Sequence, residues 1–220
     1  MSGVGPGGTM AFRPAGFRSS AFPVPPEVHL MSIVVDGKVK LTYEDYLLLP
    51  DDGLGHEIID GEHYVSPSAV PYHQRVSRRI QFQLYRQIEE TARGEVFDAP
   101  TDLHLSQIDV LVPDLLVLVG PKVGLIGPKK IEGPPDLVVE ITSPGSAKRD
   151  RGIKRAVYER AGVPEYWVVD VDRKHVERHV LRDGKYVLDG RYGDSIAFEG
   201  LPDVTVDLGK VWSPPPPPTA

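Results

Sequence analysis

Residues 112–170 decide the fold, and they read VPDLLVLVGPKVGLIGPKKIEGPPDLVVEITSPGSAKRDRGIKRAVYERAGVPEYWVVD. Three apolar runs that are typical of strands lie at 114–119, 136–142 and 165–171. Residues 147–161 have the pattern of a helix between the second and third runs. A helix that links two strands in this way makes them parallel, with a right-handed crossover. The stretch therefore predicts a β-α-β unit preceded by a further strand.

Three charged residues of this unit stand where apolar residues are expected. Asp114 opens the first run, Glu140 interrupts the second, and Lys154 falls on the core-facing side of the helix. The run at 136–142 is apolar on both faces apart from Glu140, which is typical of a strand that is buried on both sides. A lone carboxylate in such a strand is costly unless it is paired, protonated or bound to a cation.

The predicted helix has one apolar face. At about 100° per residue, this face carries Ile153, Val157, Tyr158 and Ala161. Asp150 and Lys154 fall within the same arc, whereas other charged side chains lie on the opposite side: Lys148, Arg151, Arg155 and Glu159. A lysine that faces a sheet with a buried glutamate indicates a cluster of charged side chains that serves a function.

Two acids on strands and one lysine suit metal-assisted hydrolysis of a phosphodiester. Asp114 and Glu140 would hold Mg²⁺ or Mn²⁺ through carboxylate oxygens, with water at the remaining positions. The metal would polarise the phosphate and activate a water, while Lys154 would stabilise developing negative charge. The structural alternative is a buried salt bridge between Glu140 and Lys154 with no catalysis, although buried ion pairs are not obviously stabilising.

Four motifs resemble those of the Uma-two family: Val-Pro-Asp114, Pro-Asp-Leu-Val-Val-Glu140-Ile-Thr-Ser-Pro, Asp150-x3-Lys154-x3-Tyr158, and Gly162-Val-Pro-Glu-Tyr-Trp-Val-Val-Asp170. The resemblance runs from about residue 41 to about residue 212. That family belongs to the PD-(D/E)XK, restriction-endonuclease-like superfamily. The resemblance implies an α/β (α+β) fold with a restriction-endonuclease-like core, in which helices flank a mixed sheet.

The superfamily pattern places a lysine two residues after the glutamate, but here that position is Thr142. In the Uma-two pattern the lysine has moved to the next helix, where Lys154 stands. The resemblance therefore implies Asp114 and Glu140 as metal ligands, the carbonyl of Ile141 as a further ligand, and Lys154 as the relocated lysine. With these roles, the chain is expected to be a Mg²⁺- or Mn²⁺-dependent endonuclease acting on nucleic acid.

Two further residues are candidates for accessory roles. Glu57 lies in a Glu-x-x-Asp-Gly-Glu pattern that the family shares, on a hairpin with Asp60-Gly61 at its turn. It is either an accessory acid near the metal or a strand glutamate at a sheet edge. His73 lies near the start of a helix predicted at 71–93. It is either a hydrogen-bonded histidine packed at a helix end or a residue that positions a phosphate or a water.

The helix predicted at 71–93 has two distinct faces. One apolar stripe contains His73, Val76, Ile80, Leu84 and Ile88 at spacings of three or four residues. Arginines form another stripe on the opposite face: Arg75, Arg79, Arg86 and Arg93. The arginine face either serves solubility or follows a phosphate backbone. Basic residues also cluster at Lys122, Lys129 and Lys130, and at Lys148, Arg149, Arg151, Arg155 and Arg160.

Strands are also predicted outside the central unit. Residues 95–105 alternate through Val96, Phe97, Leu103 and Leu105, and should pair antiparallel with the strand that Asp114 opens. Residues 176–181, 185–188 and 195–198 read as short strands with Asp-Gly turns between them. They predict a C-terminal β-meander that extends the sheet or forms a dimer edge.

Composition bounds the remaining possibilities. The chain has 220 residues, a net charge of −6 and no cysteine, which excludes disulfides and cysteine-ligated zinc. No apolar run approaches the ~20 residues that span a bilayer, so a cytoplasmic protein is expected. An irregular N-terminal arm (1–31), one endonuclease-like domain (32–212) and a proline-rich tail (213–220) are predicted. The alternative function is a catalytically silent dimeric binding protein, and a homodimer is expected in either case.

Overall fold

The computed structural model describes residues 32–35, 37–66, 68–142 and 150–214. The predicted N-terminal arm (1–31) lies outside these residues. Residues 147–149 of the predicted helix and residues 215–220 of the proline-rich tail also lie outside them.

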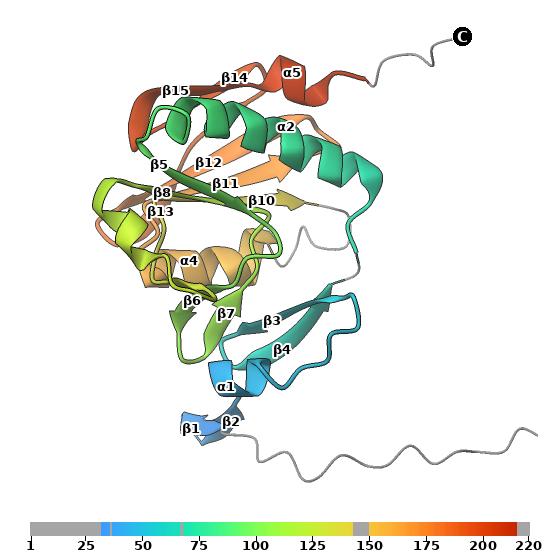
Figure 1. The fold of residues 1–220 in the computed structure, drawn as a ribbon, viewed down its shortest axis with the longest axis vertical. Coiled ribbons are helices and arrows are strands. Elements are labelled where there is room, and N and C mark those ends of the chain that lie inside the picture. The colour runs from blue at the N-terminus through green and yellow to red at the C-terminus, as the bar shows by residue number, and fades with distance from the viewer. Residues whose placement is uncertain (1–31, 36, 67, 143–149, 215–220) are drawn as a thin grey trace, which may run out of the picture.

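The larger sheet is built mainly from the central stretch and the residues C-terminal to it (Figure 1). Its strands are β5 (Gly94–Asp98), β8 (Leu115–Val119), β10 (Leu137–Thr142), β11 (Glu165–Asp170), β12 (His175–Arg182) and β13 (Lys185–Tyr192). They lie in the order β13-β12-β11-β10-β8-β5. Strands β10 and β11 pair in parallel, and the other neighbours pair antiparallel. The parallel pair that the central stretch predicts is therefore present, within a mixed sheet.

One face of this sheet packs against α2 (Pro71–Ile88), which begins at Pro71, where the missing N–H costs no helical hydrogen bond. The predicted apolar stripe is confirmed, since Val76, Ile80, Leu84 and Ile88 are fully buried. They pack on Leu115, Val117, Leu137, Val139 and Trp167 of the sheet. The helix ends at Ile88, five residues before the predicted end.

The C-terminal residues pack on the other side of α2. The predicted strand at 195–198 is β14 (Ser195–Phe198), and it pairs with β15 (Leu201–Asp207), which precedes α5 (Leu208–Trp212). The buried side chains of this hairpin belong to the same apolar core as α2. The meander prediction is confirmed for β12 and β13, which extend the sheet, whereas β14 lies in a separate two-stranded sheet. Because α2 lies between two layers, Arg79 and Arg93 of the predicted arginine stripe contact C-terminal residues.

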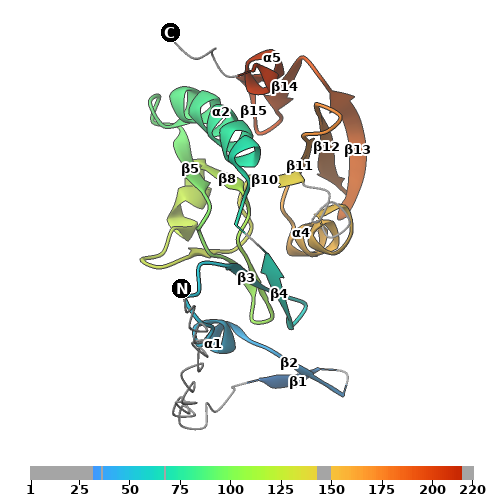
Figure 2. The ribbon, with the colours of Figure 1, turned by 90° about the vertical axis from the view of Figure 1, so that its right-hand side faces the viewer.

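The opposite face of the larger sheet contacts α4 (Arg155–Ala161) and a second sheet. The second sheet has the order β4-β3-β7-β6-β9. Its strands are β3 (Gly55–Ile59), β4 (Glu62–Ser66), β6 (Leu103–Ser106), β7 (Asp109–Leu111) and β9 (Ile131–Glu132). Figure 2 shows its β3 and β4 strands below the larger sheet. The predicted hairpin turn is confirmed: Asp60 and Gly61 have φ of 51° and 71°, as a two-residue hairpin turn requires.

The single strand predicted at 95–105 is wrong in its second half. Residues Gly94–Asp98 pair antiparallel with β8, as expected, but Leu103 and Leu105 belong to β6 in the other sheet. Pro100 has no N–H to donate to a ladder, so the strand stops before it and the chain changes sheets. Alternation alone could not reveal this change, because it does not specify which sheet a strand joins.

The remaining elements lie at the N-terminal end of the described chain (Figure 2). Strands β1 (Ile33–Val35) and β2 (Lys38–Lys40) form a hairpin, and α1 (Tyr43–Tyr46) comes next in the chain. Helix α1 begins with a capping box, in which the Thr42 N–H donates to Asp45 Oδ2 at 2.7 Å. A 3₁₀ segment, η1 (Gly120–Leu125), comes directly after β8. In the described residues, no helix is long and apolar enough to cross a bilayer.

Candidate active site

Asp114 and Glu140 meet because β8 and β10 pair antiparallel. The last registered pair is Leu115 with Val139, so the next residues along, Asp114 and Glu140, stand side by side. Alternation along both strands turns these two side chains away from α2 and towards α4. The backbone N–H of Ile141 donates to Asp114 Oδ2 at 2.6 Å, which holds the aspartate against β10.

His73 reaches the same aspartate from the first turn of α2. Its Nε2 lies 2.8 Å from Asp114 Oδ1, and both side chains are largely buried. Burial by itself would lower the pKa of His73, but the hydrogen bond and the charge of Asp114 outweigh it and raise the pKa. His73 is thus a packed, hydrogen-bonded histidine whose partner is a candidate metal ligand. That it positions a phosphate or a water stays a prediction.

Lys154 and Tyr158 converge on Glu140. The ammonium of Lys154 lies 2.9 Å from Glu140 Oε1, and the Tyr158 hydroxyl donates to the same oxygen at 2.7 Å. All three residues are at least 96% buried. Both hydrogen bonds use Oε1, so Oε2 is the carboxylate oxygen of Glu140 left for another ligand.

Glu57 binds the same lysine from the second sheet. Its Oε1 lies 2.8 Å from Lys154 Nζ and accepts the N–H of Val112 at 3.0 Å. Strand β3 lies between β4 and β7, and Glu57 is only 3% exposed, so the interpretation as a glutamate at a sheet edge is wrong. The two sheets are therefore joined at this point by a buried glutamate, lysine and glutamate.

A π-helical turn, η2 (Asp150–Lys154), places Asp150 and Lys154 inside the protein. Both are buried, as the helical arc predicts, but Ile153 of the same predicted arc is 42% exposed. The reason is the wider i→i+5 turn, which changes the direction of side chains relative to the α-helix after it. Arg151 anchors this turn from outside, with its guanidinium 2.7 Å from Asp170 and 3.3 Å from Glu177.

The site carries more negative than positive charge. Burial raises the pKa of Glu140, the charge of Lys154 opposes this rise, and the charges of Asp150, Asp114 and Glu57 add to it. Burial alone would lower the pKa of Lys154, but Glu140 and Glu57 outweigh it and raise the pKa, so the lysine is a cation. Four carboxylates thus face one ammonium and one histidine, and the arrangement favours a further cation.

The donor set fits a hard divalent cation. Mg²⁺ is commonly held by one or two carboxylates with several waters, and Asp114, Glu140 and the carbonyl of Ile141 are donors of that kind. Each carboxylate oxygen of Asp114 has lone pairs beyond the hydrogen bond it accepts. No group of three or more His, Asp or Glu side chains in the described residues is arranged as a metal site. A cation here would consequently keep water as much of its coordination.

The chain matches the model of one known protein family over most of its length. The model of the Uma2 family, described as "Putative restriction endonuclease", matches residues 43–209, about three quarters of the chain. The chain belongs to the Uma2 family. All the residues of the site lie within the matched range, from Glu57 to Tyr158. The family's description supports a nuclease-like function for this Uma2 protein.

A solved structure shows the same fold. It is the crystal structure of "a putative nuclease belonging to DUF820 from Anabaena variabilis ATCC 29413". The TM-score is 0.66 at 14% identity, and the match covers 78% of this chain and 97% of that one. The Uma2 chain therefore has the restriction-endonuclease-like core that its motifs implied. No curated protein matches it.

Two residues of the Uma2 site were not assigned roles from the sequence. Tyr158 binds Glu140, and Asp150 lies close enough to act electrostatically on Glu140, Lys154 and His73. The signal was present as the spacing Asp150-x3-Lys154-x3-Tyr158, which places three polar groups on one buried side of a helix. Spacing could not show that the glutamate on the neighbouring strand is their common partner.

Proposed function

We propose that this protein is a divalent-metal-dependent nuclease that hydrolyses phosphodiester bonds of nucleic acid. One observation carries the proposal: Asp114 and Glu140 stand side by side on adjacent strands, with the buried ammonium of Lys154 held against Glu140. The family match and the shared fold support a nuclease. Asp114, Glu140 and the Ile141 carbonyl would hold Mg²⁺ or Mn²⁺, which supplies Lewis-acid polarisation of the phosphate and activation of water.

The side chains around these ligands keep them in place for that reaction. His73 and the Ile141 N–H each bind one oxygen of Asp114, which fixes the direction of its lone pairs. The Tyr158 hydroxyl and Lys154 bind a single oxygen of Glu140 and leave its other oxygen available. Ligands held in this way need no rearrangement when substrate binds.

Lys154 acts as the fixed positive charge of the site. An ammonium has three N–H donors, and Glu57 and Glu140 accept two of them. The third N–H is available to a non-bridging oxygen of the phosphate or to the attacking water. The two glutamates keep the lysine protonated, so it stabilises the negative charge that develops on the phosphate oxygens during attack.

Cleavage of plasmid and of labelled oligonucleotides with Mg²⁺, Mn²⁺ or EDTA tests the proposal. We expect metal-dependent cleavage that falls by at least about 100-fold in Asp114→Asn, Glu140→Gln and Lys154→Met. Glu165→Gln is the matched control, because Glu165 is a buried carboxylate on β11 away from the site. It accepts hydrogen bonds from the Trp167 indole and from the backbone N–H of Glu199. Unchanged cleavage in Asp114→Asn and Glu140→Gln would refute the proposal.

Calorimetric titration with Mn²⁺ separates this function from the alternative of a catalytically silent binding protein. The nuclease requires a saturable Mn²⁺ site that is lost in Asp114→Asn and kept in Glu165→Gln. A folded wild-type protein that neither binds Mn²⁺ nor cleaves any substrate would favour the silent binding protein.

A further inference from the structure

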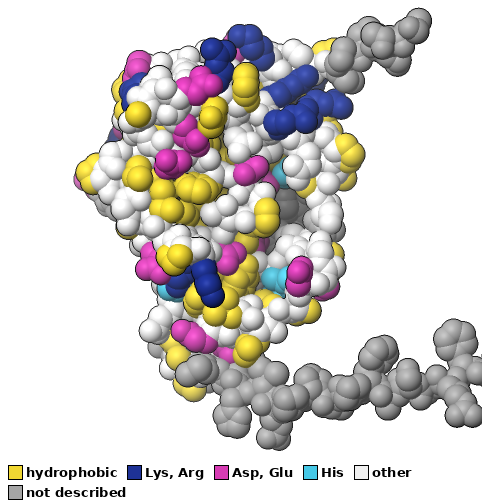
Figure 3. Space-filling view, viewed as in Figure 1, with side chains coloured by type: hydrophobic (Ala, Val, Ile, Leu, Met, Phe, Trp, Pro, Cys, Tyr) yellow, Lys and Arg dark blue, Asp and Glu magenta, His cyan; other side chains and the backbone are white. Residues whose placement is uncertain are grey.

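Helix α2 has an unusual charge for this chain. Its residues Pro71–Ile88 include four arginines and no acid, although the whole chain has a net charge of −6. Figure 3 shows Lys and Arg side chains gathered at the upper right, over the region that α2 and α5 occupy in Figure 1. Such a concentration of positive charge in an acidic protein favours an anionic partner at this surface.

The outward side of α2 combines these cations with an exposed aromatic ring. Arg78, Phe82 and Arg86 lie one after another at four-residue spacing, and we call them the α2 ridge. Phe82 is 59% exposed, and the Arg86 guanidinium lies 5.9 Å from the centre of its ring. A large exposed ring between two arginines is costly to leave in water and suits a partner with both negative charge and flat apolar faces.

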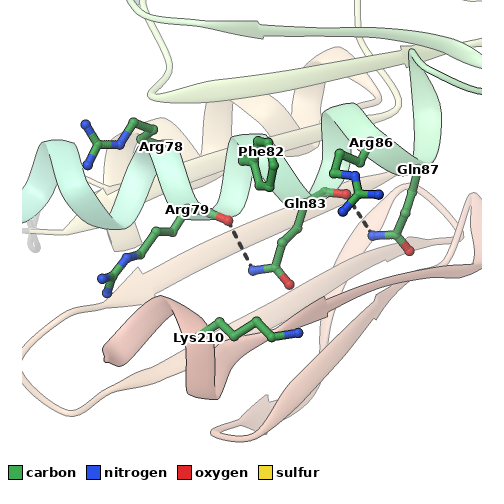
Figure 4. Close-up of a pocket in the computed structure, with 7 residues that line it drawn as sticks. All are labelled: Arg78, Arg79, Phe82, Gln83, Arg86, Gln87 and Lys210. Atoms are coloured by element: carbon green, nitrogen blue, oxygen red, sulfur yellow. Dashed lines mark hydrogen bonds between the residues drawn. The ribbon is translucent and has the colours of Figure 1, made fainter. Parts of the chain in front are cut away.

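A groove of about 680 Å³ runs beside the ridge, between α2 and α5. Figure 4 shows Arg79, Gln83 and Gln87 directed from α2 towards the C-terminal elements, with Lys210 opposite them on α5. Gln83 and Gln87 bind both the N–H and the carbonyl of Asp207 and Thr205 in β15. These paired hydrogen bonds give the groove a fixed wall.

The cations of the α2 ridge are available to a ligand. Arg86 pairs with Glu90 at 3.6 Å, but both side chains are at least half exposed, and such pairs contribute little. Arg78 is exposed and has no ion-pair partner among the described residues. By contrast, two described arginines of the cluster predicted at 148–160 already have acidic partners, because Arg151 binds Asp170 and Arg160 binds Asp109.

The ridge leads away from the candidate active site along one helix. His73, which binds Asp114, lies five residues before Arg78 and thirteen before Arg86. At ~1.5 Å per residue, these separations correspond to roughly 8 Å and 20 Å along the axis. Arg78, Phe82 and Arg86 face outward, on the side of α2 away from His73. A strand that leaves the site and crosses over the start of α2 would therefore reach the ridge within several nucleotides.

We propose that the α2 ridge binds a single-stranded segment of nucleic acid that flanks the phosphodiester to be cleaved. Arg78 and Arg86 bind backbone phosphates, with Lys210 across the groove, and an unpaired base stacks on Phe82. This inference rests on the proposed function, because it concerns the substrate of the same site. The exposed ring favours a single strand, since the base faces of a duplex are not accessible to a side chain on its outside.

Fluorescence anisotropy in EDTA measures this binding without cleavage. The probes are a labelled 20-nucleotide oligothymidylate and a labelled 20-base-pair duplex. We expect wild-type protein to bind the single strand more tightly. Arg78→Ala/Arg86→Ala should raise its Kd roughly tenfold and reduce the slope of log Kd against log salt by about 1.4, or ~0.7 for each lost phosphate contact. Arg182→Ala/Lys185→Ala, which removes two exposed cations from β12 and β13, should change neither quantity by as much.

Substitutions of Phe82 test the stacked base separately. Phe82→Ala and Phe82→Leu should weaken binding of the single strand roughly five- to a hundredfold with an unchanged salt slope, whereas Phe82→Trp should retain it. Phe82→Leu preserves an apolar contact and loses only the aromatic face. If the ridge instead packed against a second copy of the chain, Phe82→Leu would bind like wild type. Phe82→Ala would then lower the molecular mass measured by light scattering.

Each outcome separates the inference from the proposed function. The inference is refuted if the ridge variants and the Arg182→Ala/Lys185→Ala control bind the single strand equally, or if the duplex binds more tightly. Metal-dependent cleavage that persists in that case leaves the nuclease intact. Binding that depends on the ridge in a protein without cleavage supports the surface and refutes the nuclease.

Discussion

At the residue scale, the site depends on a buried lysine between two buried carboxylates. Lys154 joins Glu57 of the second sheet to Glu140 of the larger sheet, at 2.8 and 2.9 Å. Removing charges from water costs several kcal/mol for each ion, and their attraction offsets this cost only when every partner is present. Removing any one of Glu57, Glu140 and Lys154 therefore leaves a buried charge without its partner.

Lys154→Met should consequently destabilise the protein by about 3–5 kcal/mol, because it leaves two carboxylates buried without their cation. The double variant Lys154→Met/Glu140→Gln should lose at least about 1 kcal/mol less than the sum of the single losses. Urea unfolding of the three variants measures these values. Lys185→Met, at an 80% exposed side chain, should stay within about 0.5 kcal/mol of wild type. Additive single losses would show that Lys154 and Glu140 are not coupled.

His73 should influence the metal through Asp114. Residues that hydrogen-bond to metal ligands typically change affinity or activity 10–100-fold when they are removed, roughly what we expect for Mn²⁺ affinity in His73→Ala. His63→Ala is the control, since His63 is an exposed histidine of β4 that contacts His56. Calorimetric titration of both variants with Mn²⁺ measures the difference. Equal affinities would restrict His73 to a packing role.

At the scale of elements, η2 must be held so that Asp150 and Lys154 face inwards. Arg151 provides this attachment by binding Asp170 at the end of β11 and Glu177 of β12. Asp170 also accepts the N–H of Arg173, which closes the turn after β11. A π-helical turn has weaker local preference than an α-helix, so its geometry depends on such contacts with neighbouring strands.

Asp170→Asn should cost about 2 kcal/mol at pH 7. Burial alone would raise the pKa of Asp170, but hydrogen bonds from Arg173 and Arg151 lower it from 3.8 to about 2. A lowered folded-state pKa contributes stability that is present above the unfolded value and is lost as the pH falls towards 2. Urea unfolding at pH 7, 5 and 3 should show a constant difference from wild type down to pH 5 and roughly half of it at pH 3. A difference independent of pH would contradict this attachment, and the exposed Asp172→Asn is the control.

At the scale of the whole molecule, the two sheets and α2 converge on the site. Glu57 comes from one sheet, Asp114 and Glu140 from the other, and His73 from the helix between the larger sheet and the C-terminal hairpin. A ligand that binds both Asp114 and Glu140 therefore binds only the folded state. Its binding free energy adds to the free energy of unfolding.

Mn²⁺ should raise the thermal stability of the protein for this reason. At a free concentration of 100 times Kd the gain is about 2.7 kcal/mol, which corresponds to a Tm increase of roughly 5–10 °C for a domain of this size. The increase should disappear in Asp114→Asn/Glu140→Gln. Glu132→Gln, at an exposed position of β9, should keep it. A metal-dependent shift that survives the double substitution would place the cation elsewhere.

Local patterns predicted most of the elements that position the site. The strands around Asp114 and Glu140, the parallel pairing of β10 with β11 and the buried stripe of α2 are all set by residues close together in the chain. The change of sheet after Asp98, the exposure of Ile153 and the β15 and α5 elements were not predicted. Each of these depends on which distant surface covers a residue, and periodicity carries no such information.

The sequence by itself determined the chemistry: two carboxylates on apolar strands, a lysine on a core-facing arc, and motifs of the Uma2 family. The tertiary structure alone decided the partners, since it placed Glu57 on Lys154, His73 on Asp114 and Tyr158 on Glu140. It also decided which arginines of α2 face solvent, because packing between two layers occupies Arg79 and leaves Arg78 and Arg86 outside. The physical reason is that residue type and spacing set what a side chain can do, whereas its partner is set by long-range packing.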